Sequence, residues 1–148
     1  MPANVNVSAI GTSLRIVASN TFPSGFTVTQ FADDADPLDI PNSNVAEATM
    51  NINGDLVIKS SPSPITININ VLPTTEDDDN LQALLDANRP AKGRSFAKDV
   101  ITMIVTYAGG KRISYTGGAI LTGNVGDAVA SASRIKSKMY AFAFQDKN

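Results

Sequence analysis

Two acidic clusters are the first candidates for a binding site in this sequence, because oxygen-rich runs can bind calcium. The first is the run Glu76-Asp77-Asp78-Asp79. The second comprises Asp33, Asp34, Asp36 and Asp39. Neither has the alternating aspartate spacing and late glutamate of a calcium-binding loop. The first run follows Thr75 and precedes several leucines, so helix capping explains it more simply. We interpret the second as a solvated or interface loop and expect no bound metal.

The chain contains no histidine and no cysteine. Histidine is the usual general base, the partner of a nucleophilic serine and a common metal ligand, whereas cysteine supplies thiolates and disulfides. Their absence excludes serine–histidine catalysis, histidine-ligated zinc and haem, thiolate sites and disulfides. An enzyme would have to use carboxylates, as glycosidases do, or lysine or tyrosine. Nothing places two carboxylates across a cleft, and aromatic residues make up only 6% of the chain. We therefore predict no enzymatic activity and no cofactor.

Glycine pairs and a basic stretch are the remaining motifs that resemble binding sites. Gly109-Gly110 and Gly117-Gly118 lie outside any phosphate-binding glycine-rich pattern, so we interpret them as turn and bend residues. Arg134, Lys136 and Lys138 alternate along one expected strand and could form a nucleic-acid patch. Because tryptophan is absent, stacking platforms for single strands are poorly supplied. An interface or solvated strand face fits these basic residues better.

Length and charge indicate a folded protein with two halves of opposite sign. We expect a single domain over residues 1–148, of which 43% are hydrophobic. No apolar run is long enough to span a membrane, and we expect no leader at residues 1–17. Up to residue 90 there are eleven acidic and three basic residues, and from residue 91 three acidic and nine basic. This distribution suits either head-to-tail contact between copies or pairing of the halves within one chain.

Short alternating runs with turn residues between them predict a mainly β protein. We expect strands at residues 5–10, 13–17, 26–31, 45–52, 56–59, 65–72, 99–107, 112–116, 119–121 and 134–144. Residues 65–72 are the clearest strand, because β-branched residues alternate with neutral polar ones. Asn53-Gly54 predicts a hairpin with a two-residue type I′ turn.

One helix is expected at about residues 76–88, with Leu81, Leu84 and Leu85 on one face and an end before Pro90. Residues 33–44 contain clustered aspartates and two prolines, which oppose both helix and sheet, and predict a long exposed acidic loop. The predicted fold class is therefore mainly β: a small antiparallel β-barrel or sandwich with one short flanking α-helix.

Residues 45–144 resemble the tail tube proteins of contractile-tailed bacteriophages. The order of elements carries the resemblance. The hairpin NGDLVIKSS precedes the alternating strand PITININVLP, which leads into the turn and short helix TTEDDDNLQALLDANRP. A strand–turn–strand with a glycine pair and an aromatic-rich last strand follow. Residues 33–44 stand where such proteins have a long stacking loop. Tube proteins of the type VI secretion system share this fold.

The resemblance implies a structural subunit that assembles with itself into hexameric rings, which stack into a tube. That tube would conduct DNA without sequence-specific binding, and would contact tail sheath, tape measure, baseplate and tail terminator proteins. The implied location is the virion tail, after assembly in the host cytoplasm and without membrane insertion. The alternative is a non-enzymatic β-sandwich module that binds or decorates a virion or secretion apparatus.

A tube that conducts DNA needs a wet wall that is neutral or acidic, because lysine and arginine retain phosphates. We therefore expect two polar strand faces to line the bore, namely Glu47, Thr49, Asn51, Thr66, Asn68 and Asn70. We expect contact between rings through the acidic loop, at Asp33, Asp34, Asp36 and Asp39. The basic stretches at residues 92–98 and 134–138 would receive that loop and set the register of stacking.

Overall fold

One open path of antiparallel strands forms most of the protein. The structure, a computed structural model, describes residues 11–33, 35–93, 95–131 and 134–148. Neighbouring strands follow the order β2-β1-β7-β8-β9-β6-β3, with β10 beside β8. Their bounds are β1 Ser13–Ala18, β2 Phe22–Val28, β3 Leu38–Asp39, β6 Ile65–Val71, β7 Ile101–Thr106, β8 Arg112–Gly123, β9 Lys138–Phe144 and β10 Asp146–Lys147. A separate two-stranded sheet contains β4 Ala46–Met50 and β5 Leu56–Ser60.

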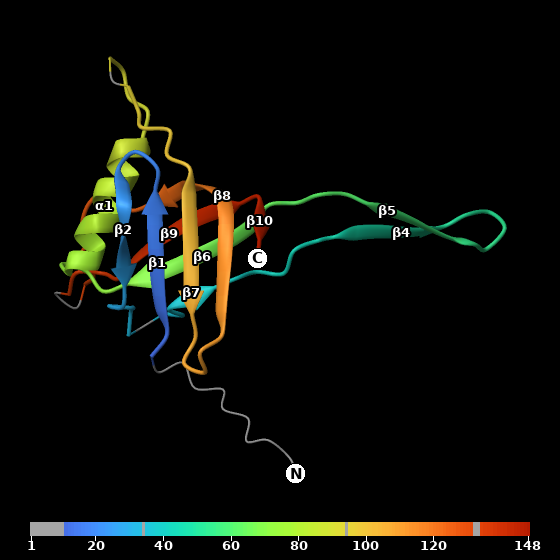
Figure 1. The fold of residues 1–148 in the computed structure, drawn as a ribbon, viewed down its shortest axis with the longest axis horizontal. Coiled ribbons are helices and arrows are strands. Elements are labelled where there is room, and N and C mark those ends of the chain that lie inside the picture. Colours follow the sequence, from blue (N-terminus) through green and yellow to red (C-terminus); the bar gives the residue numbers. More distant parts are fainter. Residues whose placement is uncertain (1–10, 34, 94, 132–133) are drawn as a thin grey trace, which may run out of the picture.

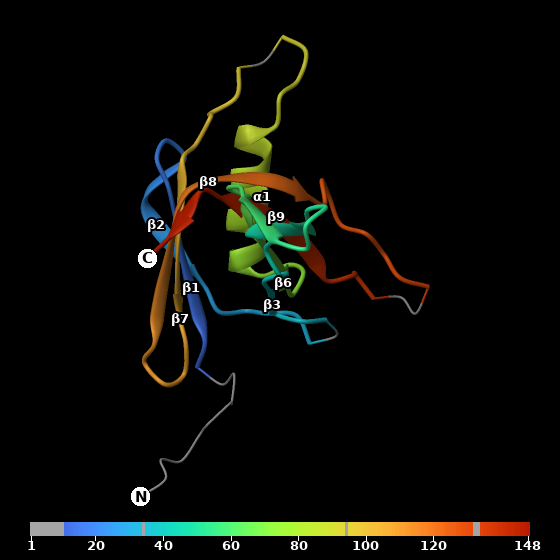
Figure 2. The ribbon, with the colours of Figure 1, turned by 90° about the vertical axis from the view of Figure 1, so that its right-hand side faces the viewer.

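Strand β8 bends and belongs to both halves of the path. It pairs with β7 as far as Gly118 and with β9 from Ala119 onward. Gly117 has a φ of +64°, and a Cβ on Gly118 would lie 2.3 Å from the Phe144 ring. The glycine pair therefore permits the bend predicted from the sequence. Around this bend the sheet folds into two layers, with β1 and β7 in one and β6 and β9 in the other (Figure 2).

The core lies between these layers and is closed on one side by α1, Glu76–Asn88 (Figure 1). As predicted, Ile67, Ile69 and Val71 of β6 point inward and are fully buried. The helix contributes its predicted stripe, Leu81, Leu84 and Leu85, to the same cluster. The fold class is confirmed as mainly β with one short helix. It is sandwich-like, because the strand path among the described residues does not close into a barrel.

Helix α1 begins and ends where the local sequence predicts. Thr75 is the N-cap, and its Oγ1 accepts a hydrogen bond of 3.2 Å from the Asp78 backbone N–H. The Asp78 carboxylate in turn accepts from the Thr74 N–H, which is one residue before the position expected of a capping box. Arg89, which precedes Pro90, has extended backbone angles and ends the helix.

Buried carboxylates connect the helix ends to the strands. Asp77 accepts hydrogen bonds of 2.8 Å from the backbone N–H groups of both Thr29 and Gln30, just after β2. At the other helix end, Asp99 accepts bonds of 2.7 Å and 2.9 Å from the backbone N–H groups of Asn20 and Thr21. These bonds satisfy backbone donors of the β1–β2 turn and of the segment after β2.

Asp99 also bonds to the side chain of Asn88, the last residue of α1. The Asn88 amide donates to Asp99 Oδ2 over 2.8 Å, and its Oδ1 accepts from the Asp99 N–H over 2.9 Å. Burial raises the pKa of Asp99, but the hydrogen bonds from Thr21, Asn88 and Asn20 outweigh it and hold the pKa below its ordinary value. Asp99 thus connects the β1–β2 turn, the helix end and the start of β7.

Several predicted boundaries differ from those in the structure. Residues 134–137 precede β9 and make only one isolated bridge, Ile135 with Val129, instead of extending the strand. Residues 33–44 are not an uninterrupted loop, since half-buried Leu38 packs on the core and β3 pairs with the edge of β6. Pairing at an edge tolerates the flanking prolines. The predicted strand at residues 5–10 lies outside the described residues.

Replacing Asp99 with asparagine should lower the free energy of unfolding by about 2–3 kcal/mol, because an amide group would face several donors. Because folding lowers the pKa of Asp99, its contribution exists above the unfolded value of about 3.9 and disappears as pH falls through the folded value. Urea unfolding from pH 7 to pH 3 tests this, with exposed Asp146→Asn as the control. An equal difference between Asp99→Asn and wild type at pH 3 and pH 7 would contradict the argument.

Candidate functional site

The β4–β5 hairpin projects from the body on the side opposite α1 (Figure 1). We call residues 45–61 the arm. Every residue from 46 to 60 is exposed. Its strands pair only with each other among the described residues, and Ser61 N–H donates to the Val45 carbonyl at its base. The arm therefore lacks the packing that stabilises the body. An isolated two-stranded hairpin of this kind is only marginally stable in water.

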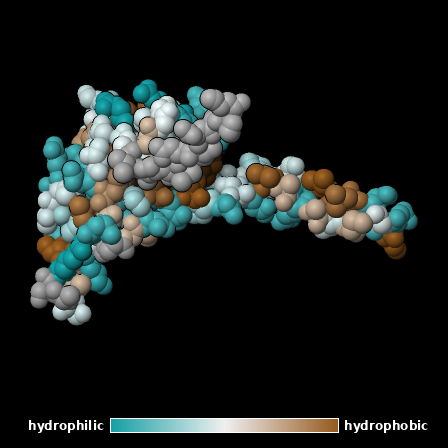
Figure 3. Space-filling model, turned by 90° about the horizontal axis from the view of Figure 1, so that it is seen from below, coloured by the Kyte–Doolittle hydropathy of each residue, from teal (hydrophilic) through white to brown (hydrophobic). Residues whose placement is uncertain are grey.

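The two faces of the arm differ in chemistry. Paired residues share a face, and Ala48 pairs with Ile58 while Met50 pairs with Leu56. Met50, Leu56 and Ile58 are each 59–64% exposed. We call Ala48, Met50, Leu56 and Ile58 the apolar face. The opposite face carries Glu47, Thr49, Val57 and Lys59. Figure 3 shows hydrophobic side chains, coloured brown, along the arm. A soluble subunit does not normally leave such a strip uncovered.

The arm turn explains the register of these faces. The predicted hairpin is present, but the predicted two-residue turn is wrong. The Gly54 N–H donates to the Asn51 carbonyl, Gly54 has a φ of +83°, and Asn53 does not adopt a positive φ. The Asn51 side chain also accepts from the Asp55 N–H over 2.8 Å. This three-residue loop shifts the register by one residue, and so brings Met50 opposite Leu56.

A second surface is the outer side of β6, β9 and the end of β8. Residues of the three strands lie directly opposite one another and are neutral or small: Thr66, Asn68, Asn70, Ala119, Thr122, Met139, Ala141 and Ala143. We call these eight residues the neutral face. The predicted polar face of β6 is thus present, and its residues Thr66, Asn68 and Asn70 are half-buried. Glu47, Thr49 and Asn51 belong to the separate arm, so the structure does not bring the two predicted sets into one sheet.

The acidic segment is partly satisfied within its own chain. Asp33 pairs with Arg134 over 2.6 Å, and the hydrogen bond from this guanidinium holds the pKa of Asp33 below its ordinary value. The Asp36 carbonyl accepts from the Asn70 side chain over 2.7 Å. Asp39 lies in β3, where its carboxylate is 3.5 Å from the Asn68 amide. Asp34 lies outside the described residues. Part of the charge asymmetry is therefore paired internally.

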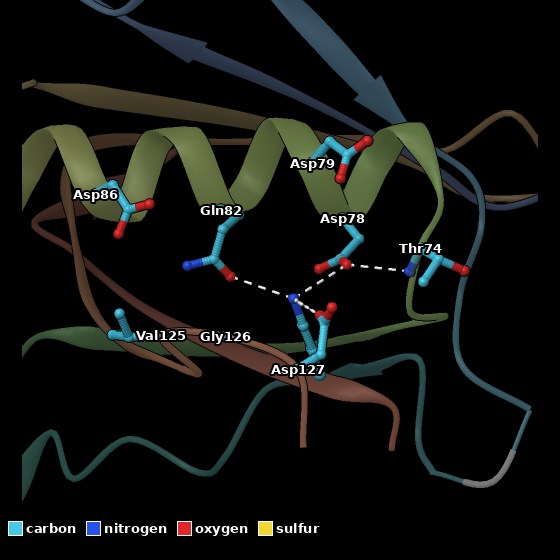
Figure 4. A pocket seen from close by; sticks show the side chains of 9 residues that line it. Thr74, Asp78, Asp79, Gln82, Asp86, Val125, Gly126 and Asp127 are labelled. Carbon is cyan, nitrogen blue, oxygen red and sulfur yellow. Dashed lines mark hydrogen bonds and ion pairs between the residues drawn. The ribbon is translucent and has the colours of Figure 1, made fainter. Parts of the chain in front are cut away.

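Lys138 and Asp78 are charged residues that are almost fully buried. The Lys138 amine is 3.2 Å from Asp78, 2.7 Å from Asp127 and 3.3 Å from the Gln82 side chain, and the Lys138 side chain is 3% exposed. These groups line a polar cavity of about 470 Å³ between α1 and the loop after β8 (Figure 4). Burial lowers the pKa of Lys138, but Asp127 and Asp78 outweigh it and raise the pKa above its ordinary value.

Sequence reasoning placed Lys138 on an exposed basic face and missed this role. The signal was present, because Lys138 alternates in phase with Tyr140, Phe142 and Phe144, which all point into the core. The Tyr140 hydroxyl donates to Asp78 over 3.0 Å, which further satisfies the buried carboxylate. Lys138 therefore connects β9, the helix and the loop carrying Asp127. It is a structural group, and of the predicted basic stretch at residues 134–138, Arg134 and Lys136 are exposed.

The described residues contain neither a metal-binding cluster nor a helix that could span a membrane. No group of three or more histidine, cysteine, aspartate or glutamate side chains in that part of the chain is arranged to hold a metal ion. Asp77 and Asp78, from the predicted calcium alternative, instead bond to backbone donors, Lys138 and Tyr140. No helix in the same residues has the length and apolar character that crossing a membrane requires.

The protein therefore combines a sandwich-like β fold with an arm that pairs with no other strand among the described residues. The chain belongs to the family of tail fiber protein gp32, whose model matches residues 5–148. It is therefore a phage-tail-related protein, as the resemblance to tail proteins predicted. The family description does not specify a tail tube. No curated protein sequence matches the chain.

Two solved structures are similar to this chain at low sequence identity, and the first shares its fold. One is a chain in the anti-feeding prophage (AFP) baseplate, solved by cryo-EM and six-fold symmetrised. It is 10% identical, has a TM-score of 0.55, and the match covers 99% of this chain and 96% of that chain. Another is a chain in the sheath/tube terminator of an extracellular contractile injection system, PVC, in the extended state. It is 13% identical, has a TM-score of 0.49, and the match covers the same shares of the two chains.

Replacing Lys138 with methionine should cost about 3–5 kcal/mol of unfolding free energy, because Asp78 would stay buried without its cation. Thermal and urea unfolding measure the loss. The double variant Lys138→Met with Asp78→Asn should recover part of it, since no uncompensated charge remains. Lys136→Met, at an exposed position, is the control. If the double variant were no more stable than the single one, the ion-pair explanation would be wrong.

Proposed function

We propose that this protein is a structural subunit of a phage tail tube. In this proposal, subunits form hexameric rings, the rings stack into the conduit for DNA ejection, and the tube lies in the virion tail. The subunits assemble in the host cytoplasm and the tube meets sheath, tape measure, baseplate and tail terminator proteins. The domain acts without catalysis or cofactor. The family match, which makes the chain phage-tail-related, is compatible with this role.

The apolar face of the arm is the observation that carries the proposal. Its residues pair only with one another among the described residues, and three of them are large hydrophobic side chains that are mostly exposed. Burial of apolar area contributes roughly 25 cal/mol per Å², so covering this strip on another chain would be favourable. A marginal hairpin would also be stabilised by that contact. An arm of this kind suits a subunit whose folding is completed by assembly.

Open sheet edges support closure into a ring. The strand path ends at β2 on one side and at the two-residue strand β3 on the other. Different edges on one subunit favour head-to-tail contacts, which form a ring when the rotation closes. The similar AFP chain comes from a baseplate reconstructed with six-fold symmetry. That six-fold symmetry is the support for six subunits per ring.

The neutral face is our candidate for the wall of the bore. Its eight residues include no charged side chain. A surface of amides, hydroxyls and methyl groups would let DNA pass without the counterion release that makes basic grooves bind it. Thr66, Asn68 and Asn70 therefore remain assigned to the wall. Glu47, Thr49 and Asn51 join the wall in an assembly where the arm face opposite the apolar face lies next to the neutral face.

Charged segments at opposite ends of the body suit stacking of rings. The segment that leads into β3 lies in the lower part of the body in Figure 1, and the loop between α1 and β7 extends from the upper end. The first segment contains Asp36 and Asp39, and the second contains Lys92 and Lys98. Contact between such ends in successive rings would set their register more than their affinity. Asp33 takes part less directly, because Arg134 of the same chain already pairs with it.

A β-sandwich module that binds or decorates the virion is the second candidate. The description of the family as tail fiber protein favours it. The two candidates differ in assembly, since a tube subunit forms rings or tubes of uniform width. A decoration module would remain a monomer or small oligomer. Negative-stain electron microscopy of the purified chain separates these outcomes.

Replacing Ile58 with aspartate on the apolar face should abolish rings and tubes, while the body of the subunit folds normally. A charge on this face would have to be buried without a partner in the assembled contact. Electron microscopy and sedimentation velocity measure assembly, and circular dichroism checks the fold. Thr49→Asp, on the opposite face, is the matched control and should still assemble. Normal tubes from Ile58→Asp would remove the main support for the proposal.

Replacing Thr66 with lysine should leave tubes intact but slow DNA release from assembled particles, with the delay shrinking as salt increases. DNA release can be followed with an intercalating dye after ejection is triggered. Thr66→Gln adds a longer neutral side chain and is the control for length. Equal release rates for the lysine and glutamine variants at low salt would argue against a bore position for this face.

A further inference from the structure

We propose that the apolar face of the arm docks in a groove beside the C-terminal end of α1 on a second copy of this chain. This inference rests on the proposed self-assembly and names the surface that receives the arm. The groove has a volume of about 320 Å³ and is bordered by the helix end and by the end of β8. Its apolar lining includes Leu85, Pro90, Ile120, Leu121 and Val125.

The groove contains apolar side chains that are not buried in the core of the body. Leu121 is 57% exposed and Val125 is 61% exposed, although both adjoin the core residue Leu85. Gly123 forms part of the floor, where an added Cβ would lie 2.7 Å from Tyr140 and 2.9 Å from Leu85. The strand and helix therefore approach closely, and a shallow surface remains open above them. Such a surface accepts a flat strand ribbon better than a helix.

The positions of the arm and the groove determine which copy can fill it. The arm leaves the body on the side opposite α1, whereas the groove lies at the end of α1 (Figure 1). The arm of one subunit therefore points away from its own groove. The same contact repeated from copy to copy is head-to-tail, which is the arrangement that rings and tubes need. A depression at the arm base, lined by Ile40, Val45 and Tyr115, lies on the same side as the arm and would instead favour closed pairs.

The turn of the arm and the segment after the groove carry opposite charge. The arm carries Glu47, Lys59 and Asp55, a net charge of −1, with Asp55 in its exposed turn. Arg89 lines the groove and pairs with Asp86 over 3.8 Å, whereas Lys92 and Lys98 follow in the loop beyond the groove lining. Opposite potentials steer encounter and disfavour the reversed orientation. Apolar contact supplies the affinity and charge supplies the orientation.

The absence of cysteine allows one contact to be tested by cross-linking. A chain with Met50→Cys and Leu121→Cys should assemble and, on mild oxidation, give a ladder of disulfide-linked oligomers on non-reducing gels. Thr49→Cys with Leu121→Cys places the first thiol on the opposite arm face and should give no ladder. Met50→Cys with Thr66→Cys tests the neutral face as a receiver and should also give none.

Two non-assembling variants provide the second measurement. Ile58→Asp removes the donor face, and Leu121→Asp, at an exposed position, removes the receiver. Each alone should be monomeric by sedimentation velocity, and their mixture should give a one-to-one complex, since one intact arm and one intact groove remain.

The outcomes separate this inference from the function on which it rests. Tubes that form without the Met50–Leu121 ladder, or that form normally from Leu121→Asp, would overturn the inference and leave the tube proposal standing. A wild-type chain that forms no oligomer at any concentration would overturn both.

Discussion

The bend in β8 is the constraint on which the rest of the fold depends. One strand must pair with β7 along its first half and with β9 along its second, so the two layers are parts of one hydrogen-bonded path. This works only where the backbone can turn and the Phe144 ring can lie against it, which is why Gly118 cannot carry a side chain. The position of the bend fixes where the core opens, and α1 fills that opening.

Local signals in the sequence predicted a helix or strand well where those signals agreed with one another. The helix at residues 76–88 matches α1, because the Thr75 cap, the leucine stripe and Pro90 all favour the same limits. The inward face of β6 was equally clear from alternation. The turn of the arm was not, since the Asn53-Gly54 signal competed with the register that gathers apolar residues on one face. Edge strand β3 has only two residues and depends on tertiary contact with β6.

The surfaces were harder to predict than the fold. Alternation indicated a wet face on β6, but only the strand order shows that small residues of β9 and β8 extend it. The same reasoning could not show that Glu47 belongs to a separate sheet, because pairing between strands is set by long-range contacts. Lys138 was misplaced for a related reason. A charged residue is normally assigned to solvent, and its burial depends on Asp78 and Asp127, which are distant in sequence.

The prolines that flank the arm have a consequence for the unassembled subunit. Pro41, Pro62 and Pro64 flank the arm, and proline restricts the backbone where a hinge would be needed. The arm is therefore poorly suited to folding back over its own body, and the effective concentration of its apolar face near the rest of the same chain is low. A free subunit then has no self-shielded resting form. If subunits assemble as proposed, they stay dispersed below a critical concentration and add to the polymer above it, so the supply of subunits would control when growth begins.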